Sequence, residues 1–237
     1  MTTMHVDYTS DGLGVAGKNL SFMAEPGFLE AYEWSMNFTW NGQACPWRKM
    51  DLRWRTHICV WAARHALHLD GAFVECGVDT ALYSGAIARH LDFANLPRRF
   101  VLFDTFAGIP DVTDMTEAER QMKDSLNTNY YFDCHDFVKE KLRAYPNIDI
   151  IRGVLPGTLS AIQDLRIAYL SVDLNNAASE KAVIEALWPQ LVPGAVVVID
   201  DYGFTPHARQ HDMWDAFATS QDRLIASLPT GQGLLLK

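Results

Sequence analysis

From Ala72 onward, short apolar runs of strand length alternate with segments of helical periodicity. The expected strands are almost continuously apolar, as strands are when helices cover both faces of a parallel sheet. This alternation predicts an α/β fold: a doubly wound, mostly parallel, seven-stranded sheet of the Rossmann-like kind. The expected strands are residues 72–76, 100–104, 148–152, 168–173, 196–200, 223–227 and 234–236, and the expected helices are residues 82–91, 135–144, 179–191 and 206–219.

The two ends of the chain depart from this alternation. The last two expected strands are separated by only a few residues, which predicts an antiparallel C-terminal hairpin at one edge of the sheet. Residues 1–71 hold five of the seven tryptophans and a helical segment at 51–69. We interpret them as an N-terminal helical extension that packs on the sheet or provides a substrate or dimer surface, while residues 72–237 form the cofactor-binding domain.

The charge balance excludes some partners. Lys and Arg number 20 against 29 Asp and Glu, a net charge of -9, so we expect neither nucleic acid nor a membrane surface as partner. The N-terminus lacks the basic flank and apolar stretch of a signal peptide, and the apolar runs are too short to span a bilayer. The four cysteines show neither zinc spacing nor a disulfide framework, which favours a cytoplasmic protein.

Two neighbouring strand ends predict a cofactor site. Glu75 and Gly77 close the first strand, and Asp104 ends the second, where a carboxylate is placed to accept both hydroxyls of a ribose. The G-x-G-x-x-G pattern of dinucleotide-binding proteins is missing, because Gly77 is followed by VDTA at 78–81 and the next glycine is Gly85. A nucleoside cofactor without phosphates suits the site better, and S-adenosylmethionine has that shape.

Acidic residues also end later strands. Asp173, Asp200 and Asp201 are expected to converge at one sheet edge, where like charges are stable only if a cation or a proton is shared. A divalent ion with oxygen ligands is one interpretation; helix caps and solvated acids are the other. His207 begins a helix beside these acids and is a candidate base. Residues 105–133 are long for a connection and form either a solvated helical loop or a lid.

Several motifs resemble the macrocin O-methyltransferase (TylF-like) family of class I S-adenosylmethionine-dependent methyltransferases. They are VECGV at 74–78, DTFAGIP at 104–110, LWPQLVPG at 187–194 and VIDDYG at 198–203. The resemblance implies a magnesium-dependent enzyme that methylates hydroxyls of sugars or related natural products. It also implies that Asp104 binds the ribose, with Thr105 and Phe106 beside the cofactor, and that Asp173, Asp200 and Asp201 bind Mg²⁺.

Three positions depart from the family pattern. Asn175 replaces its second acid, Ala177 its tyrosine and Ala81 the second glycine of its first motif. We therefore expect a cytoplasmic, homo-oligomeric O-methyltransferase that uses S-adenosylmethionine and Mg²⁺ on a small hydroxylated acceptor, with Asp173 as base and His207 as the alternative. A nicotinamide-dependent sugar oxidoreductase and a catalytically silent binding module are the rival interpretations.

Overall fold

The computed structural model describes residues 6–237. The first five residues of the N-terminal extension, which enter the signal-peptide prediction, lie outside the described residues. The main sheet has seven strands in the order β10-β11-β9-β8-β5-β6-β7. Its strands are β5 (Ala72–Cys76), β6 (Phe100–Asp104), β7 (Ile148–Arg152), β8 (Ile167–Val172), β9 (Leu191–Ile199), β10 (Ala226–Ser227) and β11 (Gly233–Leu236).

The pairing of these strands confirms the predicted doubly wound sheet. β7, β6, β5, β8 and β9 run parallel, whereas β11 pairs antiparallel with both β9 and β10. The chain starts at the centre with β5, proceeds outward through β6 and β7, and returns to β8 on the other side of β5. The strand order therefore reverses between β5 and β8, which is where open sheets of this kind bind ligands.

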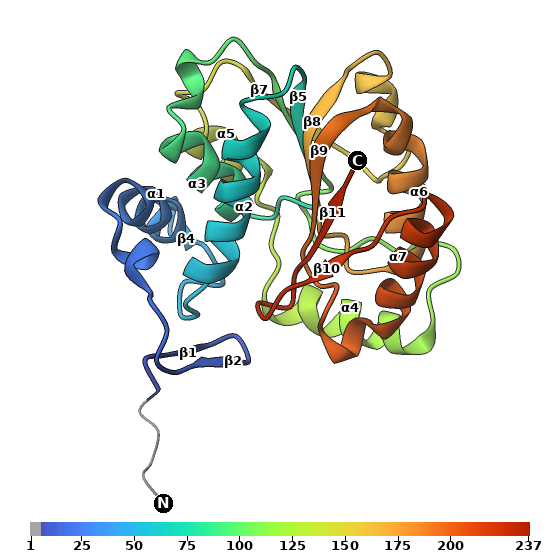
Figure 1. Ribbon diagram of the computed structural model, residues 1–237, viewed down its shortest axis with the longest axis horizontal. Coiled ribbons are helices and arrows are strands. Elements are labelled where there is room, and N and C mark those ends of the chain that lie inside the picture. Colours follow the sequence, from blue (N-terminus) through green and yellow to red (C-terminus); the bar gives the residue numbers. More distant parts are fainter. Residues whose placement is uncertain (1–5) are drawn as a thin grey trace, which may run out of the picture.

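Helices cover both faces of the sheet, as Figure 1 shows. The helices α2 (Arg53–Ala66), α3 (Leu82–His90) and α5 (His135–Lys141) lie on one face, and α6 (Ala177–Leu187) and α7 (Ala208–Ser220) on the other. The residues of β5 and β8 are all buried, because helices shield the central strands from water on both sides. None of the helices that the structure describes has the length and apolar content to cross a bilayer.

The N-terminal part contains more than helices. It holds α1 (Pro26–Asn37) and α2, and also two small hairpins, β1 (Tyr8–Ser10) with β2 (Leu13–Val15) and β3 (Thr39–Trp40) with β4 (Gln43–Ala44). Glu25 fixes the start of α1, because its carboxylate accepts hydrogen bonds from the backbone of Gly27 and Phe28. Core residues of α1 and α2 belong to the same hydrophobic cluster as the sheet.

Several boundaries differ from those expected. The helix expected at 179–191 is α6, which ends at Leu187; Pro189 follows it in a short 3-10 turn. β9 then begins at Leu191, five residues before the expected strand, and ends at Ile199, so Asp200 and Asp201 follow the strand. β10 has two residues because its pairing with β11 is confined to Ala226 and Ser227. The segment 105–133 contains a regular helix, α4 (Glu117–Asn129), which a Thr116–Glu119 capping box initiates.

Candidate active site

A cavity of about 340 Å³ lies at the carboxyl ends of β5, β6, β8 and β9, around the point where the strand order reverses. This is within the usual size range of pockets for small ligands. Every site residue predicted from the sequence lines this cavity: Glu75, Gly77, Asp104, Thr105, Phe106, Asp173, Asp200, Asp201 and His207. The structure thus brings together residues that are up to 132 positions apart in the chain, since Glu75 and His207 line the same space.

Gly77 is required by the backbone itself. Its φ is +89°, and a Cβ built there would lie 1.7 Å from the carbonyl oxygen of Asp173. The ends of β5 and β8 therefore approach too closely for any side chain at this position. The end of the neighbouring strand β8 alone thus demands a glycine at this position.

Asp104 connects the two loops that border the cavity at the ends of β5 and β6. Its Oδ2 accepts hydrogen bonds from the backbone nitrogens of Val78 (2.6 Å) and Asp79 (2.8 Å), and its Oδ1 accepts one from Phe106 (2.7 Å). Thr105 donates to the carbonyl oxygen of Gly108 (2.5 Å) and steadies the same loop. These contacts fix Asp104 at the cavity wall, where its ribose-binding role stays a prediction.

Glu75 lies almost fully buried in the cavity wall. It is 2% exposed, and its Oε2 makes no hydrogen bond within the protein. Burial raises the pKa of Glu75 to about 8, and the nearby Asp200 and Asp104 add to the shift. A buried carboxyl with a free oxygen beside a cavity is suited to a ligand that donates a hydrogen bond or carries positive charge.

The three aspartates of the predicted metal site do lie together, and a guanidinium lies among them. Arg55, on α2, donates to the carboxylate and the backbone carbonyl of Asp200 and to Oδ1 of Asp201 at 2.9 Å. It also donates to Asp11, in the turn between β1 and β2, at 3.1 Å. The sequence analysis missed Arg55, because it lies in α2, 145 residues before Asp200.

The charges of this cluster explain its pKa shifts. Burial alone would lower the pKa of Arg55, but Asp200 and the other nearby acidic groups offset this and raise it well above its usual value. Burial raises the pKa of Asp173, and the adjacent Asp200 and Asp201 raise it further, while Arg55 opposes the shift. Arg55 thus offsets part of the negative charge of the converging acids.

The hydrogen-bond donors around the three aspartates occupy carboxylate oxygens that a divalent ion would need, so the arrangement does not fit such an ion. Asp200 Oδ1 accepts from Gln232 (3.1 Å) while its Oδ2 accepts from Arg55, and Asp173 Oδ1 accepts from Asn175 (3.1 Å). Each of the three carboxylates therefore accepts a hydrogen bond from a side-chain nitrogen. Within residues 6–237, no group of three or more His, Cys, Asp or Glu side chains is arranged to hold a metal ion.

His207 precedes α7 and is held in one tautomer. The amide nitrogen of Gln210 donates to Glu180 at 2.8 Å, so the amide oxygen of Gln210 faces Nδ1 of His207. Nδ1 therefore carries the hydrogen, and Nε2 of the neutral ring is a bare acceptor, 3.5 Å from Oδ2 of Asp201. His211, one turn later, contacts the carbonyl of Tyr202 and does not line the cavity.

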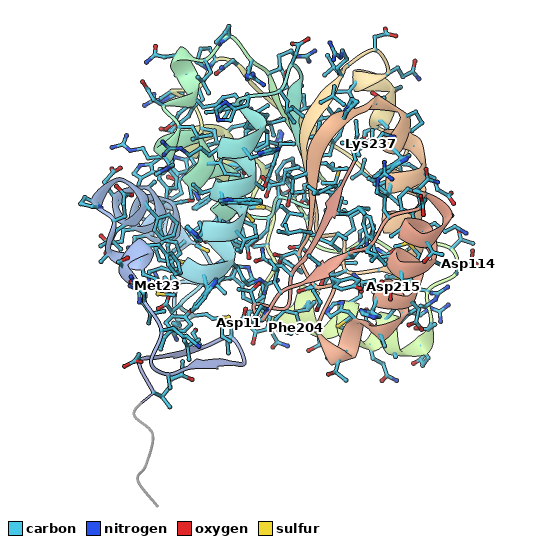
Figure 2. The ribbon with its side chains drawn as sticks, viewed as in Figure 1. Asp11, Met23, Asp114, Phe204, Asp215 and Lys237 are labelled. Carbon is cyan, nitrogen blue, oxygen red and sulfur yellow. The ribbon has the colours of Figure 1, made fainter. Side chains whose placement is uncertain are left out.

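Residues from the N-terminal part complete the wall of the cavity. Asp11, Trp47 and Met50 all line it, although the sequence analysis singled out none of them as site residues. Trp47 donates to Asp79 at 3.1 Å and stacks on Tyr130 with ring centroids 4.8 Å apart. Figure 2 shows Asp11 close to Phe204, and both contact the guanidinium of Arg55.

The fold is that of a class I methyltransferase. It has the strand order of that class, antiparallel last strands, and a cavity where the strand order reverses between β5 and β8. The O-methyltransferase NovP has this fold, with a TM-score of 0.64 at 20% identity over 86% of this chain and 87% of that chain. The calicheamicin methyltransferase CalS11 has it too, with a TM-score of 0.65 at 20% identity over 94% of this chain and 98% of that chain.

Sequence similarity then defines the family. Residues 58–225 match the macrocin-O-methyltransferase (TylF) family, and this chain belongs to it. A curated relative, the 8-demethyl-8-(2,3-dimethoxy-alpha-L-rhamnosyl)-tetracenomycin-C 4'-O-methyltransferase of Streptomyces olivaceus, is 30% identical over 141 residues. That match spans 56% of this chain and 53% of the relative, so about half of each protein is compared.

Proposed function

We propose that this protein transfers a methyl group from S-adenosylmethionine to a hydroxyl of a sugar or of a glycosylated natural product. The observation that carries the proposal is one cavity that joins the strand ends of β5 and β6 to His207 and the acids after β8 and β9. The relative from Streptomyces olivaceus acts on a rhamnosyl group, and one structure of CalS11 is described as a TDP-rhamnose 3'-O-methyltransferase. These names support a sugar hydroxyl as the acceptor.

The cofactor side of the cavity fits S-adenosylmethionine. Glu75 offers a buried oxygen without a partner, and Gly77 and Asp104 shape the adjoining wall. When bound, S-adenosylmethionine would supply a methyl group on a positively charged sulfur. The acceptor oxygen would take this methyl group in line with the departing sulfur, which leaves as S-adenosylhomocysteine. We propose that Glu75, Gly77, Asp104, Thr105 and Phe106 form its binding site.

On the acceptor side, His207 is placed to remove the hydroxyl proton. Its Nε2 has no hydrogen in the neutral ring, and Gln210 holds the other nitrogen in the donating state. Once Nε2 has taken the proton, Asp201 lies 3.5 Å away and stabilises the positive ring. Asp173 lines the same cavity and is the alternative base.

The surroundings of the site support the remaining parts of the proposal. Trp47 and Met50 line the cavity from the N-terminal part, which favours a substrate surface for residues 1–71. All four cysteines are buried and unpaired, in keeping with the proposed cytoplasmic location. A homo-oligomer stays a prediction. The Mg²⁺ requirement that the resemblance implies also stays a prediction, and the contacts of the three aspartates do not favour it.

Methyl transfer is tested with S-adenosylmethionine labelled at its methyl group, TDP-rhamnose and a rhamnosylated polyketide as acceptors. We expect a labelled product with a free hydroxyl acceptor, and His207→Asn should lower kcat by about 10²-fold or more while S-adenosylhomocysteine still binds. His211→Asn, one turn along α7, is the matched control and should keep the wild-type rate. Loss of rate in Asp173→Asn with full activity in His207→Asn would assign the base to Asp173 instead.

The same measurements separate the rival functions. A nicotinamide-dependent oxidoreductase would bind reduced dinucleotide, seen as a change in its fluorescence, and would not bind S-adenosylhomocysteine. A silent binding module would bind S-adenosylhomocysteine and release no labelled product with any sugar acceptor. Either pattern would refute the proposed methyl transfer.

A further inference from the structure

Resting on the proposed methyl transfer, we propose that Arg55 takes the place of the divalent ion. The guanidinium supplies the positive charge at the acceptor side, and the protein needs no Mg²⁺ there. Arg55 thus positions Asp200 and Asp201, the acids that the family resemblance assigns to the metal, and its Nε is left to donate to the acceptor oxygen. Two observations support this role: the contacts of Arg55, and Asn175 at a position where the family pattern has an acid.

Arg55 is held at this place from several directions. It bridges Asp200 and Asp201 after β9 and reaches Asp11 in the N-terminal hairpin. The ring of Phe204 lies against its guanidinium, with the central carbon 5.1 Å from the ring centroid. A buried arginine with three carboxylate partners is strongly favoured to remain in place, because removing it leaves uncompensated negative charges.

Nitrogen donors also occupy the second oxygen of Asp200 and one oxygen of Asp173. Gln232 donates to the second oxygen of Asp200, and Asn175 donates to Asp173. At position 175 the family pattern has an acid, so the chain has lost a carboxylate and gained a hydrogen-bond donor at the same point. A hard divalent ion requires several carboxylate or carbonyl oxygens at short range, and donors of this kind compete for them.

Arg55 also retains a donor for a ligand. Its Nε is buried and has no hydrogen-bond partner within the protein, and the residue lines the cavity. A buried, unpartnered donor is unfavourable unless a ligand oxygen satisfies it. An acceptor hydroxyl that binds near Arg55 would gain a charge-assisted hydrogen bond, and the negative charge that develops as it loses its proton would be stabilised.

Direct metal binding tests the inference without an acceptor. Purified full-length protein, treated with EDTA and desalted, is titrated with Mn²⁺ while free Mn²⁺ is followed by electron paramagnetic resonance. We expect the wild type to bind no Mn²⁺ with a Kd below about 1 mM. We expect Arg55→Ala combined with Asn175→Asp to bind one Mn²⁺, because the donors are gone and the acid is restored. Stoichiometric Mn²⁺ binding by the wild type that Asp200→Asn abolishes would overturn the inference.

Further variants keep the result interpretable. Arg53→Ala, two residues away, is the matched control, because Arg53 pairs with Asp51 and does not line the cavity. Arg55→Lys keeps the positive charge and should bind no Mn²⁺. If the double variant does not fold, the wild-type titration still decides.

Turnover and cofactor binding distinguish this inference from the proposed function. With TDP-rhamnose as acceptor, EDTA should change the wild-type rate by less than about twofold, and added Mg²⁺ should not raise it. A rate that EDTA abolishes and Mg²⁺ restores would refute the role of Arg55 and leave methyl transfer intact. Failure of S-adenosylhomocysteine to bind, measured by calorimetry, would refute the proposed function itself.

Discussion

At the scale of single residues, Glu75 shows how a buried acid beside a cavity lowers the stability of the fold. The carboxyl is fully buried at the end of β5, where its ionised form loses hydration and faces other acids. Its pKa is about 8 in the folded protein against an ordinary value of 4.5. Between these values the folded state holds a proton that the unfolded state has released, so the free energy of unfolding falls as pH rises.

Glu75→Gln should therefore stabilise the protein without ligand, mainly above neutral pH. The amide has no proton to lose, so the decline in stability between pH 4.5 and about 8 should flatten, with a gain of roughly 1–3 kcal/mol at pH 8. Thermal unfolding by circular dichroism at a series of pH values measures the gain. Glu185→Gln, on the exposed side of α6, is the control. Parallel pH curves for wild type and Glu75→Gln would contradict the expectation.

The residues that sequence reasoning found and missed differ in one respect. Asp104, Asp173 and Asp200 each end or follow an apolar run, so their place at the sheet edge follows from the strand itself. Arg55 lies on a helix whose orientation on the sheet is fixed only by tertiary packing. No local pattern distinguishes it from the neighbouring Arg53, which pairs with Asp51 just before the helix begins. The contact between Arg55 and the aspartates could therefore be found only from the three-dimensional structure.

At the scale of secondary-structure elements, the apolar strands could be predicted from the sequence, whereas the polar helix α4 could not. The strands β5, β6 and β7 are mostly apolar, and their bounds are the ones expected from the sequence. α4 has a single buried residue, Glu119, and only three apolar residues, Ala118, Met122 and Leu126, so its apolar stripe is short. Its start is set instead by the capping box, and its position by contacts with other elements.

Hydrogen bonds from Arg209 hold α4 beside the cavity. Arg209, on α7, donates to Glu119 (2.7 Å) and to the carbonyl of Asp114 (2.6 Å), and Figure 1 shows α4 beside α7. Met122 and Leu126 of α4 line the cavity below. A polar helix that covers a cavity through few buried contacts has the character of a lid.

Arg209→Ala should loosen this lid selectively. The arginine side chain is 44% exposed, so we expect a loss of about 1 kcal/mol and a roughly fivefold faster amide exchange in α4. Exchange in β5 and β8 should stay unchanged. Hydrogen–deuterium exchange read by mass spectrometry measures both regions, and Arg120→Ala, an exposed arginine of α4, serves as the control. Equal exchange in wild type and Arg209→Ala would show that α4 is held by other contacts.

At the scale of the whole molecule, the cavity joins segments from the N-terminal hairpin to the start of α7. A ligand that fills it contacts elements of both sheet faces and stabilises only the folded state. S-adenosylhomocysteine at about a hundred times its Kd should therefore add about 2.7 kcal/mol to the free energy of unfolding, a rise in Tm of roughly 5–10 °C.

Asp104→Ala should remove most of this rise in Tm, whereas Asp149→Ala, on the neighbouring β7 and outside the cavity, should keep it. Differential scanning fluorimetry with and without ligand makes the comparison for each variant against its own ligand-free Tm, because Asp104 also braces two loops. A rise with reduced dinucleotide and none with S-adenosylhomocysteine would reverse the cofactor assignment.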